Sequence, residues 1–229
     1  MEQVPNPGKN LVIQIDSKKY ARYPVKTHII IPGDKIAEVV AKYAKPYLKA
    51  GDIIFIGERS VAVSQGRTYV LSEVKPSWWA RFFVRFVAKS PYGIGLGSPE
   101  TMQMAVEEVG VPRMIIAAFF AALTKPFGIK GVFYIIAGSQ ARAVDGAASY
   151  VIPPYNNHVT KAPLNPNNVA REVAKRVNVP VAIVDACDFG VWIVGKSAGV
   201  DESLIKHALK DNPLGQSKEQ TPIGILREI

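Results

Sequence analysis

Apolar positions along the chain follow two periods, one typical of strands and the other of helices. Short β-branched runs bounded by turn residues predict strands at residues 11–15, 25–31, 53–56 and 68–71. A hairpin-like turn at residues 65–67 leads into the last of these and implies a further strand before it. The N-terminal part of the chain is therefore expected to be rich in β structure.

Apolar residues spaced three and four positions apart predict helices over residues 34–45, 77–88 and 99 onward, around residue 116, and after residue 167. Asp34, Ser77 and either Asn167 or Asn168 stand at helix starts, where N-cap residues are preferred. The most apolar stretch, residues 114–123, is much shorter than the roughly 20 residues needed to cross a bilayer. We interpret it as a buried core helix.

Strand-like runs continue in the second half of the chain, at residues 132–137, 141–144 and 179–184. The last is a continuous apolar run, as expected for a strand covered on both faces. Helices and strands mix without a regular βαβ alternation. The predicted fold class is therefore α+β, with two interlocked mixed α/β subdomains in a single unit over residues 1–229 and a subdomain boundary within residues 72–130.

The composition is that of a globular enzyme, with 48% hydrophobic and 21% charged residues among 229. A single cysteine excludes an internal disulfide and is typical of a reducing compartment. The N-terminus lacks the basic start and apolar run of a signal peptide. We expect a cytoplasmic protein without a membrane partner.

The net charge of +9 raises the question of nucleic-acid binding, because clustered cations release counterions from phosphate backbones. The basic residues are scattered, however, and the aromatic residues beside Arg81 and Arg85 fit the buried side of a helix better than a stacking platform. Attraction of an anionic small substrate or a nucleotide is favoured over nucleic acid.

Candidate chemistry lies at two apolar runs that each lead into an aspartate, Asp145 and Asp185. Burying an unpaired carboxylate costs several kcal/mol, so each requires a cation or several donors. A hard divalent ion that bridges both carboxylates and a phosphate would satisfy them, with Asp188 either as a third ligand or only as a turn residue. Alternatively, each aspartate caps a turn or pairs with a basic side chain, Arg142, Arg171 or Lys196.

A loop with three alternate glycines, Gly93, Gly95 and Gly97, precedes the helix that begins near Pro99. Its backbone N–H groups could bind a phosphate at that helix N-terminus. It lacks the spacing of a P-loop or a dinucleotide fingerprint, so a plain turn is the alternative.

Residues 211–224 combine two prolines with amide and charged side chains, among them Gln216 and Gln220. Such a segment fits a rigid loop that lines a polar site, or a solvated turn. Cys187 has acidic neighbours that disfavour a thiolate, and the histidines lack zinc-like spacing. No catalytic residue is assigned.

Several segments together resemble the gamma-glutamyl ligase family of coenzyme F420 biosynthesis. The resemblance is carried by Gly51-Asp52-Ile53-Ile54, Ser64-Gln65-Gly66-Arg67, Ala143-Val144-Asp145 and Ile183-Val184-Asp185. Segments that resemble a bacterial branch of the family are Pro76-Ser77-Trp78, Pro91 to Gly97, and Asp211-Asn212-Pro213-Leu214-Gly215-Gln216.

The resemblance implies a gamma-glutamyl ligase-like fold and an intertwined homodimer. It implies GTP-dependent, Mg²⁺- or Mn²⁺-assisted formation of an amide bond, in which the carboxylate of a small molecule becomes an acyl phosphate and the amine of L-glutamate attacks it. By position, Asp145 and Asp185 would hold the metal. The residues that would bind nucleotide or substrate are Gln65, Gly66, Arg67, the glycines of the loop at 93–97, Gln216 and Gln220.

The chain departs from the family pattern at two places. Ala62-Val63 stands where the family ligases carry Ser-Lys, and Ala186 to Phe189 stands where they carry Thr-Asn-Gly-Arg. Two cations of a phosphate site are thereby replaced. The alternative functions are a catalytically degenerate protein of the same fold that binds a nucleotide or small ligand and, less favoured, a basic nucleic-acid-binding protein.

Overall fold

The computed structural model describes residues 4–87, 95–129, 131–187 and 190–229. The chain forms two compact units. The first combines residues 1–66 with 163–229, and the second is the intervening segment, residues 67–162. The chain thus crosses from one unit to the other between Gly66 and Arg67 and returns between Ala162 and Pro163. The first crossing lies before residues 72–130, the range in which the sequence analysis places the subdomain boundary.

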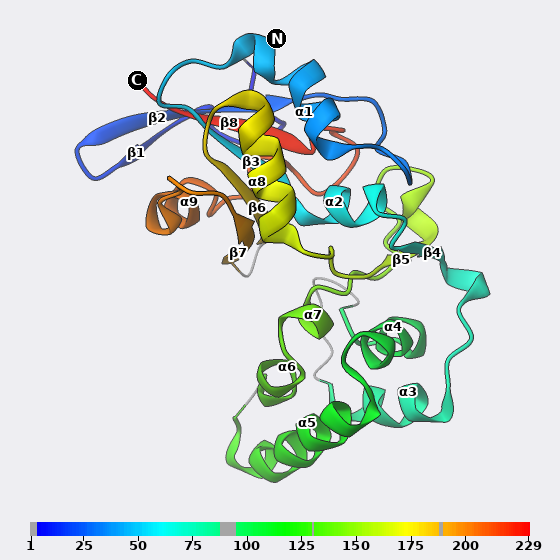
Figure 1. Cartoon of the computed structure of the whole chain (residues 1–229). Helices are drawn as coiled ribbons and strands as arrows, with labels where there is room; N and C mark the ends of the chain where they lie inside the picture. Colours follow the sequence, from blue (N-terminus) through cyan, green and yellow to red (C-terminus); the bar gives the residue numbers. More distant parts are fainter. Residues whose placement is uncertain (1–3, 88–94, 130, 188–189) are drawn as a thin grey trace. The chain divides into compact units, whose positions relative to one another are not determined.

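A six-stranded mixed sheet forms the centre of the first unit (Figure 1). Among the strands that the structure describes in this sheet, only β3 and β6 pair in parallel, and the other neighbours are antiparallel. The order across the sheet is β1 (Val12–Ile15), β2 (Lys18–Val25), β8 (Ile223–Glu228), β3 (Ile53–Gly57), β6 (Val181–Cys187) and β7 (Gly190–Lys196). The predicted strands at 11–15, 53–56 and 179–184 are confirmed as β1, β3 and β6.

Helices cover this sheet because its central strands are apolar on both faces. Phe55 of β3 packs with Ile205 and Ala208 of α9 (Glu202–Ala208). Its neighbours Ile54 and Ile56 are also fully buried and, by strand alternation, point to the opposite face. In Figure 1, α8 (Pro166–Val177) lies in front of β3 and β6, and it packs against α1 (Ile36–Tyr43).

Two strand predictions in the first unit are wrong. β2 ends at Val25, so residues 26–31 continue as a loop rather than as a strand. The pairing of β2 with β8 stops at Val25 opposite Ile223, and beyond it Thr27 is held by Gln220 instead of by a ladder. The segment before the turn at 65–67 is a helix, α2 (Glu58–Ser64), rather than the first strand of a hairpin.

Two helix caps also differ from the prediction. α1 begins after Lys35, and the Asp34 carboxylate instead accepts hydrogen bonds from the Ile31 N–H at 2.8 Å and from His28 at 2.9 Å. α8 begins after Asn165, whose side chain makes no cap hydrogen bond. After α1, a short 3-10 helix, η1 (Lys45–Tyr47), contains Pro46.

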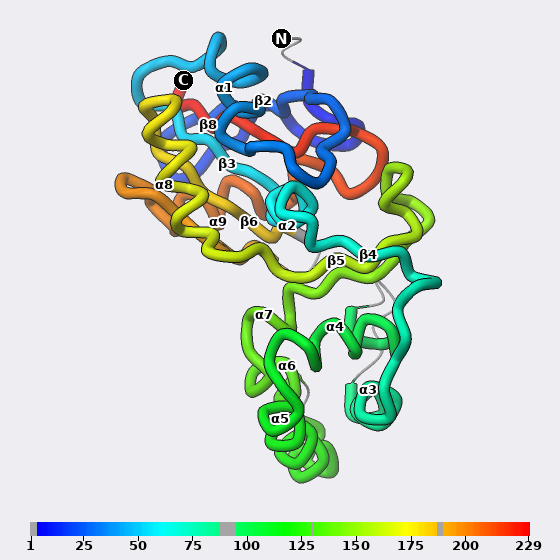
Figure 2. The backbone as a smooth tube through the Cα atoms, turned by 45° about the vertical axis from the view of Figure 1, so that its right-hand side comes forward, coloured from blue at the N-terminus to red at the C-terminus, as the bar shows by residue number. Residues whose placement is uncertain are grey.

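The second unit is mainly helical. Its helices are α3 (Trp78–Phe83), α4 (Pro99–Val109), α5 (Val111–Thr124), α6 (Val132–Ala137) and α7 (Ser139–Arg142), with single 3-10 turns at η2 (Leu71–Glu73), η3 (Val84–Phe86), η4 (Lys125–Phe127) and η5 (Tyr155–Asn157). A short antiparallel pair, β4 (Thr68–Val70) and β5 (His158–Thr160), runs side by side in Figure 2. The predicted cap of α3 is confirmed, because Ser77 accepts from the Ala80 N–H. α4 is capped by Ser98, which accepts from the Thr101 N–H and was not predicted as a cap.

Residues 132–137 and 141–144 are wrong as strands. The first segment is α6, where Phe133 and Ala137, four residues apart, are buried and Ile135 is exposed. Most of the second lies in or directly after α7. Tertiary packing selects one helical face in each case, which a short apolar run does not reveal.

The fold is mixed α/β, in agreement with the predicted α+β class. Interlocking of the two units stays a prediction. Among the described residues, no helix combines the length and apolar character that spanning a bilayer requires.

Candidate functional site

In the first unit, the carboxyl ends of β3 and β6 form one edge of the sheet. The two strands are parallel with Gly57 opposite Val184, so Glu58 and Asp185 follow at the same level. Asp185 is half-buried and lies within β6 opposite Trp192 of β7, rather than after the end of the strand as predicted. In open parallel α/β sheets, ligands bind beyond the carboxyl ends of the strands, and β3 and β6 form a parallel pair within this mixed sheet.

The loop after α9 lies against this edge. The Gly57 N–H donates to the carbonyl of Pro222 at 2.9 Å, and a Cβ at Gly57 would stand 3.8 Å from the Leu214 side chain. Gln216 is exposed in this loop. Gln220, with φ of 58°, donates from its amide to the Thr27 carbonyl at 2.5 Å and therefore anchors the loop.

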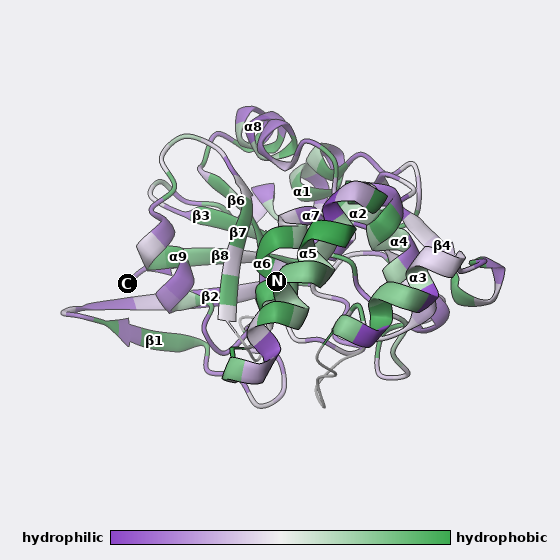
Figure 3. Ribbon diagram, turned by 90° about the horizontal axis from the view of Figure 1, so that it is seen from below, coloured by the Kyte–Doolittle hydropathy of each residue, from purple (hydrophilic) through white to green (hydrophobic). Residues whose placement is uncertain are grey.

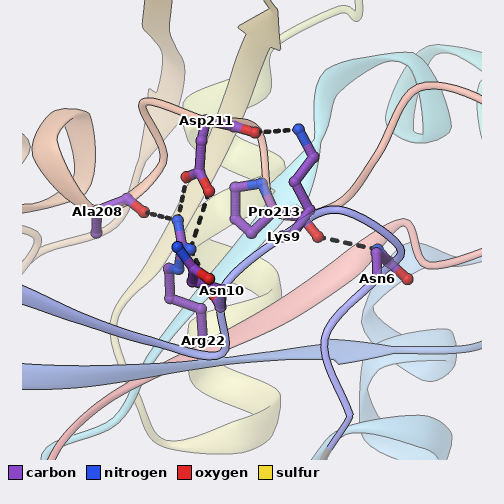
Figure 4. Close-up of polar contacts among 7 residues, drawn as sticks. All are labelled: Asn6, Lys9, Asn10, Arg22, Ala208, Asp211 and Pro213. Atoms are coloured by element: carbon purple, nitrogen blue, oxygen red, sulfur yellow. Dashed lines mark hydrogen bonds and ion pairs between the residues drawn. The ribbon is translucent and has the colours of Figure 1, made fainter.

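Side chains from distant parts of the chain fix the start of the same loop (Figure 4). Arg22, 1% exposed, forms a two-point ion pair with Asp211 and donates to the Ala208 carbonyl at 2.9 Å. Asn6 donates to the Pro213 carbonyl at 2.9 Å. Burial alone would raise the pKa of Asp211, but the hydrogen bonds and charge of Arg22 outweigh it and lower the pKa. The loop is thus side-chain-anchored rather than a solvated turn.

Asp145 belongs to the second unit. It follows α7 rather than the predicted strand, and it is exposed. Its backbone forms an isolated bridge with Thr160, with N–H···O distances of 2.9 Å in both directions. Asp145 and Asp185 thus come from different units, and their joint role as metal ligands stays a prediction.

The chain passes from the first unit to the second within the turn at residues 65–67, and the side chains before and after this point make structural contacts. The Gln65 amide donates to the Leu164 carbonyl at 2.9 Å and accepts from the Leu164 N–H at 2.7 Å. Gly66 has φ of 72°, the left-handed region that favours glycine. Arg67 pairs with Glu108 at 2.6 Å and is only 13% exposed.

Lys161 extends the ion pair of Arg67 into a network. Its ammonium group lies 2.7 Å from Glu107 and 3.6 Å from Glu108. Burial opposes ionisation of Glu107, yet hydrogen bonds from Lys161 and Gln103 lower its pKa overall. Sequence reasoning gave no signal for this network, because Lys161 and Glu107 are 54 positions apart.

The described part of the glycine loop approaches Tyr134. Gly95 has φ of 43°, and a Cβ there would stand 3.2 Å from the Tyr134 hydroxyl. The Leu96 N–H donates to that hydroxyl at 3.4 Å, so this donor is engaged within the protein. Burial raises the pKa of Tyr134, opposed by the Leu96 hydrogen bond. Gly97 follows just before α4, whereas the predicted residues Gly93 and Asp188 lie outside the described residues.

The donor set suits a hard divalent cation better than a soft one, because the predicted ligands are carboxylates. Within the ranges that the structure describes, no group of three or more His, Cys, Asp or Glu side chains gathers to hold an ion. Mg²⁺ commonly uses one or two carboxylates and completes its shell with water and substrate phosphates. The role of Asp145 and Asp185 as ligands of such an ion stays a prediction.

A family model described as F420-0:Gamma-glutamyl ligase matches residues 24–210, about four fifths of the chain. The matched segment includes both aspartates, the turn at 65–67 and most of both units. No curated protein matches the chain.

Proposed function

The chain belongs to the F420-0:gamma-glutamyl ligase family, and we propose that it joins L-glutamate to a carboxylate-bearing small molecule with GTP as co-substrate. The family match carries this proposal. The edge of the sheet formed by Gly57, Asp185 and the anchored loop supports it, because it combines a carboxylate and amide side chains at the end of two parallel strands.

The reaction consists of two balanced transfers. The acceptor carboxylate attacks the γ-phosphorus of GTP, GDP leaves, and an acyl phosphate forms. The amine of glutamate then attacks the acyl carbon, inorganic phosphate leaves, and the nitrogen loses a proton. The protein contributes mainly positioning and electrostatic stabilisation to such phosphoryl transfer.

Asp145 and Asp185 would hold Mg²⁺ or Mn²⁺, which when bound neutralises charge on the phosphates. Asp185 also offers a half-buried carboxylate, whose electrostatic interactions are stronger than those of a fully solvated one. Gln216, exposed in the anchored loop, would contact the substrate by hydrogen bonding.

Calorimetric titration with GTP and Mn²⁺ tests the proposed ligands. Asp185→Asn and Asp145→Asn keep side-chain volume while removing charge, so each is expected to weaken GTP binding at least tenfold. Asp201→Asn is the matched control, because Asp201 caps α9 by accepting from the Ser203 and Leu204 N–H groups and asparagine caps equally well.

Release of GDP and phosphate, followed with glutamate and a panel of carboxylates, tests turnover. Equal GTP affinity in the wild type and all three variants would remove both aspartates from the site. A homodimer is also part of the proposal, and sedimentation velocity measures it directly.

A ligand-binding protein without turnover is the second candidate, and the structure offers a specific reason for it. Ala62 and Val63, which replace the Ser-Lys of the family pattern, are 0% and 3% exposed within α2. Arg67 is engaged by Glu108. GTP binding without GDP release under any acceptor would select this candidate.

A further inference from the structure

The second unit carries a broad apolar surface, which we call the α5 surface. Side chains on one side of α5 and in the following segment are exposed: Ile115 (45%), Ile116 (51%), Phe119 (62%), Phe120 (42%), Leu123 (54%), Phe127 (77%), Ile129 (55%) and Ile135 (74%). In Figure 3, α5 and α6 face the viewer and are largely green, the colour of hydrophobic residues. This corrects the sequence-based interpretation of residues 114–123 as a buried core helix.

The opposite side of α5 already packs within the unit. Met114, Ala117 and Ala118 are at most 5% exposed and belong to the core of the second unit. A helix that is apolar on all sides is normally covered all round, and large exposed apolar patches mark sites of interaction. The α5 surface therefore requires a partner beyond the core that α5 serves.

The charged residues around this surface indicate the sign of the charge that a partner should carry. Of the described residues 111–129 and 131–144, the charged ones are Arg113, Lys125 and Arg142, all exposed, and none is an aspartate or glutamate. Lys125 directly follows α5 and stands two positions before Phe127, the most exposed apolar residue of the surface. The whole chain carries a net charge of +9. A second copy docked face to face would bring like charges together, whereas an anionic apolar partner complements both features.

Contrary to the sequence-based expectation of no membrane partner, we propose that the α5 surface docks the protein onto anionic lipid bilayers. Helices that lie in the membrane interface combine exposed phenylalanine and leucine with flanking lysine and arginine, and bind through buried apolar area plus attraction to anionic headgroups. Phe119, Leu123 and Phe127 enter the headgroup region, and Lys125 remains at the level of the lipid phosphates. Attachment is peripheral, and it does not depend on the proposed ligase activity.

Co-sedimentation of the full chain with vesicles tests this docking. Binding to vesicles of equal parts phosphatidylglycerol and phosphatidylcholine is expected to be roughly tenfold or more stronger than to phosphatidylcholine alone, and to weaken as salt is raised. Phe119→Ser/Leu123→Ser should reduce binding at least tenfold, because it removes apolar area from the contact. Lys125→Glu should reduce binding to anionic vesicles only.

Val12→Ser/Ile31→Ser is the matched control, because these side chains are 43% and 52% exposed in the first unit. It is expected to bind vesicles like the wild type, and circular dichroism verifies that all variants are folded. The proposal is overturned if the wild type ignores anionic vesicles at low salt, or if Phe119→Ser/Leu123→Ser binds unchanged. It is also overturned if sedimentation velocity shows an oligomeric wild type and a monomeric Phe119→Ser/Leu123→Ser variant while the wild type does not bind vesicles. That result would assign the surface to a second copy.

Discussion

The ion pair between Arg22 and Asp211 provides a sharp test of how the loop at the sheet edge is held. Arg22 lies on β2, and Asp211 lies 189 positions later at the start of the loop. The Arg22 guanidinium donates to both Asp211 oxygens and to the carbonyls of Asn10 and Ala208. Arg22→Met retains the aliphatic bulk and removes all of these donors.

The expected cost follows from burial. Removing one partner of a buried ion pair typically destabilises by about 3–5 kcal/mol, and a buried carbonyl left without a donor costs about 1–3 kcal/mol. Asp211 is 45% exposed, so water partly replaces its lost partner. We therefore expect Arg22→Met to lose about 3–4 kcal/mol. Asp211→Asn should lose about 2–4 kcal/mol, because the Arg22 guanidinium, 1% exposed, keeps both carbonyls but loses its counter-charge.

Urea unfolding monitored by circular dichroism measures both variants and the double variant. Because Asp211→Asn removes nothing further once Arg22 is gone, the double variant should be about as stable as Arg22→Met. The lowered pKa of Asp211 means that its stabilisation is present above the carboxyl's unfolded pKa and is lost as pH falls through the folded pKa. Strict additivity of the two single variants, or a loss below about 1 kcal/mol for Arg22→Met, would refute this account.

Four further outcomes are expected. Ser98→Ala removes the cap of α4 and should cost about 1 kcal/mol, measured as a lower urea midpoint. Gly224→Ala would place a Cβ 2.1 Å from the Phe55 ring and should cost at least about 1–3 kcal/mol by the same measurement. Phe133→Ala, in the core at 2% exposure, should cost about 3–5 kcal/mol, whereas Phe119→Ala should change stability by less than about 0.5 kcal/mol. Chelation of divalent ions should abolish GTP binding in calorimetry, whereas a moderate rise in salt should only weaken it.

The sequence identifies elements whose local pattern agrees with their tertiary environment. The apolar run of β6 is buried on both faces, and Ser77 caps α3 as expected. The sequence does not identify an element correctly where tertiary packing decides between a strand and a helix. Residues 132–137 have strand-like composition, yet Gly131 and Gly138 bound a single helical segment there. The exposure of α5 was equally hidden, because an apolar sequence does not state which side is covered.

The candidate site likewise contains features that the sequence reveals and features that it does not. Asp185 and the loop at 211–224 are recognisable from sequence, because an aspartate in an apolar strand and a cluster of amides both need partners. Two ion pairs could not be recognised from the sequence, Arg22–Asp211 and Lys161–Glu107. Their partners are 189 and 54 positions apart, respectively, and no local pattern links them. The role in ligand binding that the resemblance implies for Arg67 stays a prediction, and its ion pair with Glu108 is another distant contact that the sequence does not reveal.

These contacts constrain the source of any affinity for a triphosphate. Around β4 and β5, Arg67 and Lys161 face Glu107 and Glu108, so this network is formally neutral and attracts anions weakly. The net charge of +9 speeds the encounter with an anion, but it is screened beyond about 8 Å at physiological ionic strength. A divalent ion on carboxylates would instead place positive charge in direct contact with the phosphates. For this reason, removal of the metal should affect nucleotide binding far more than salt does.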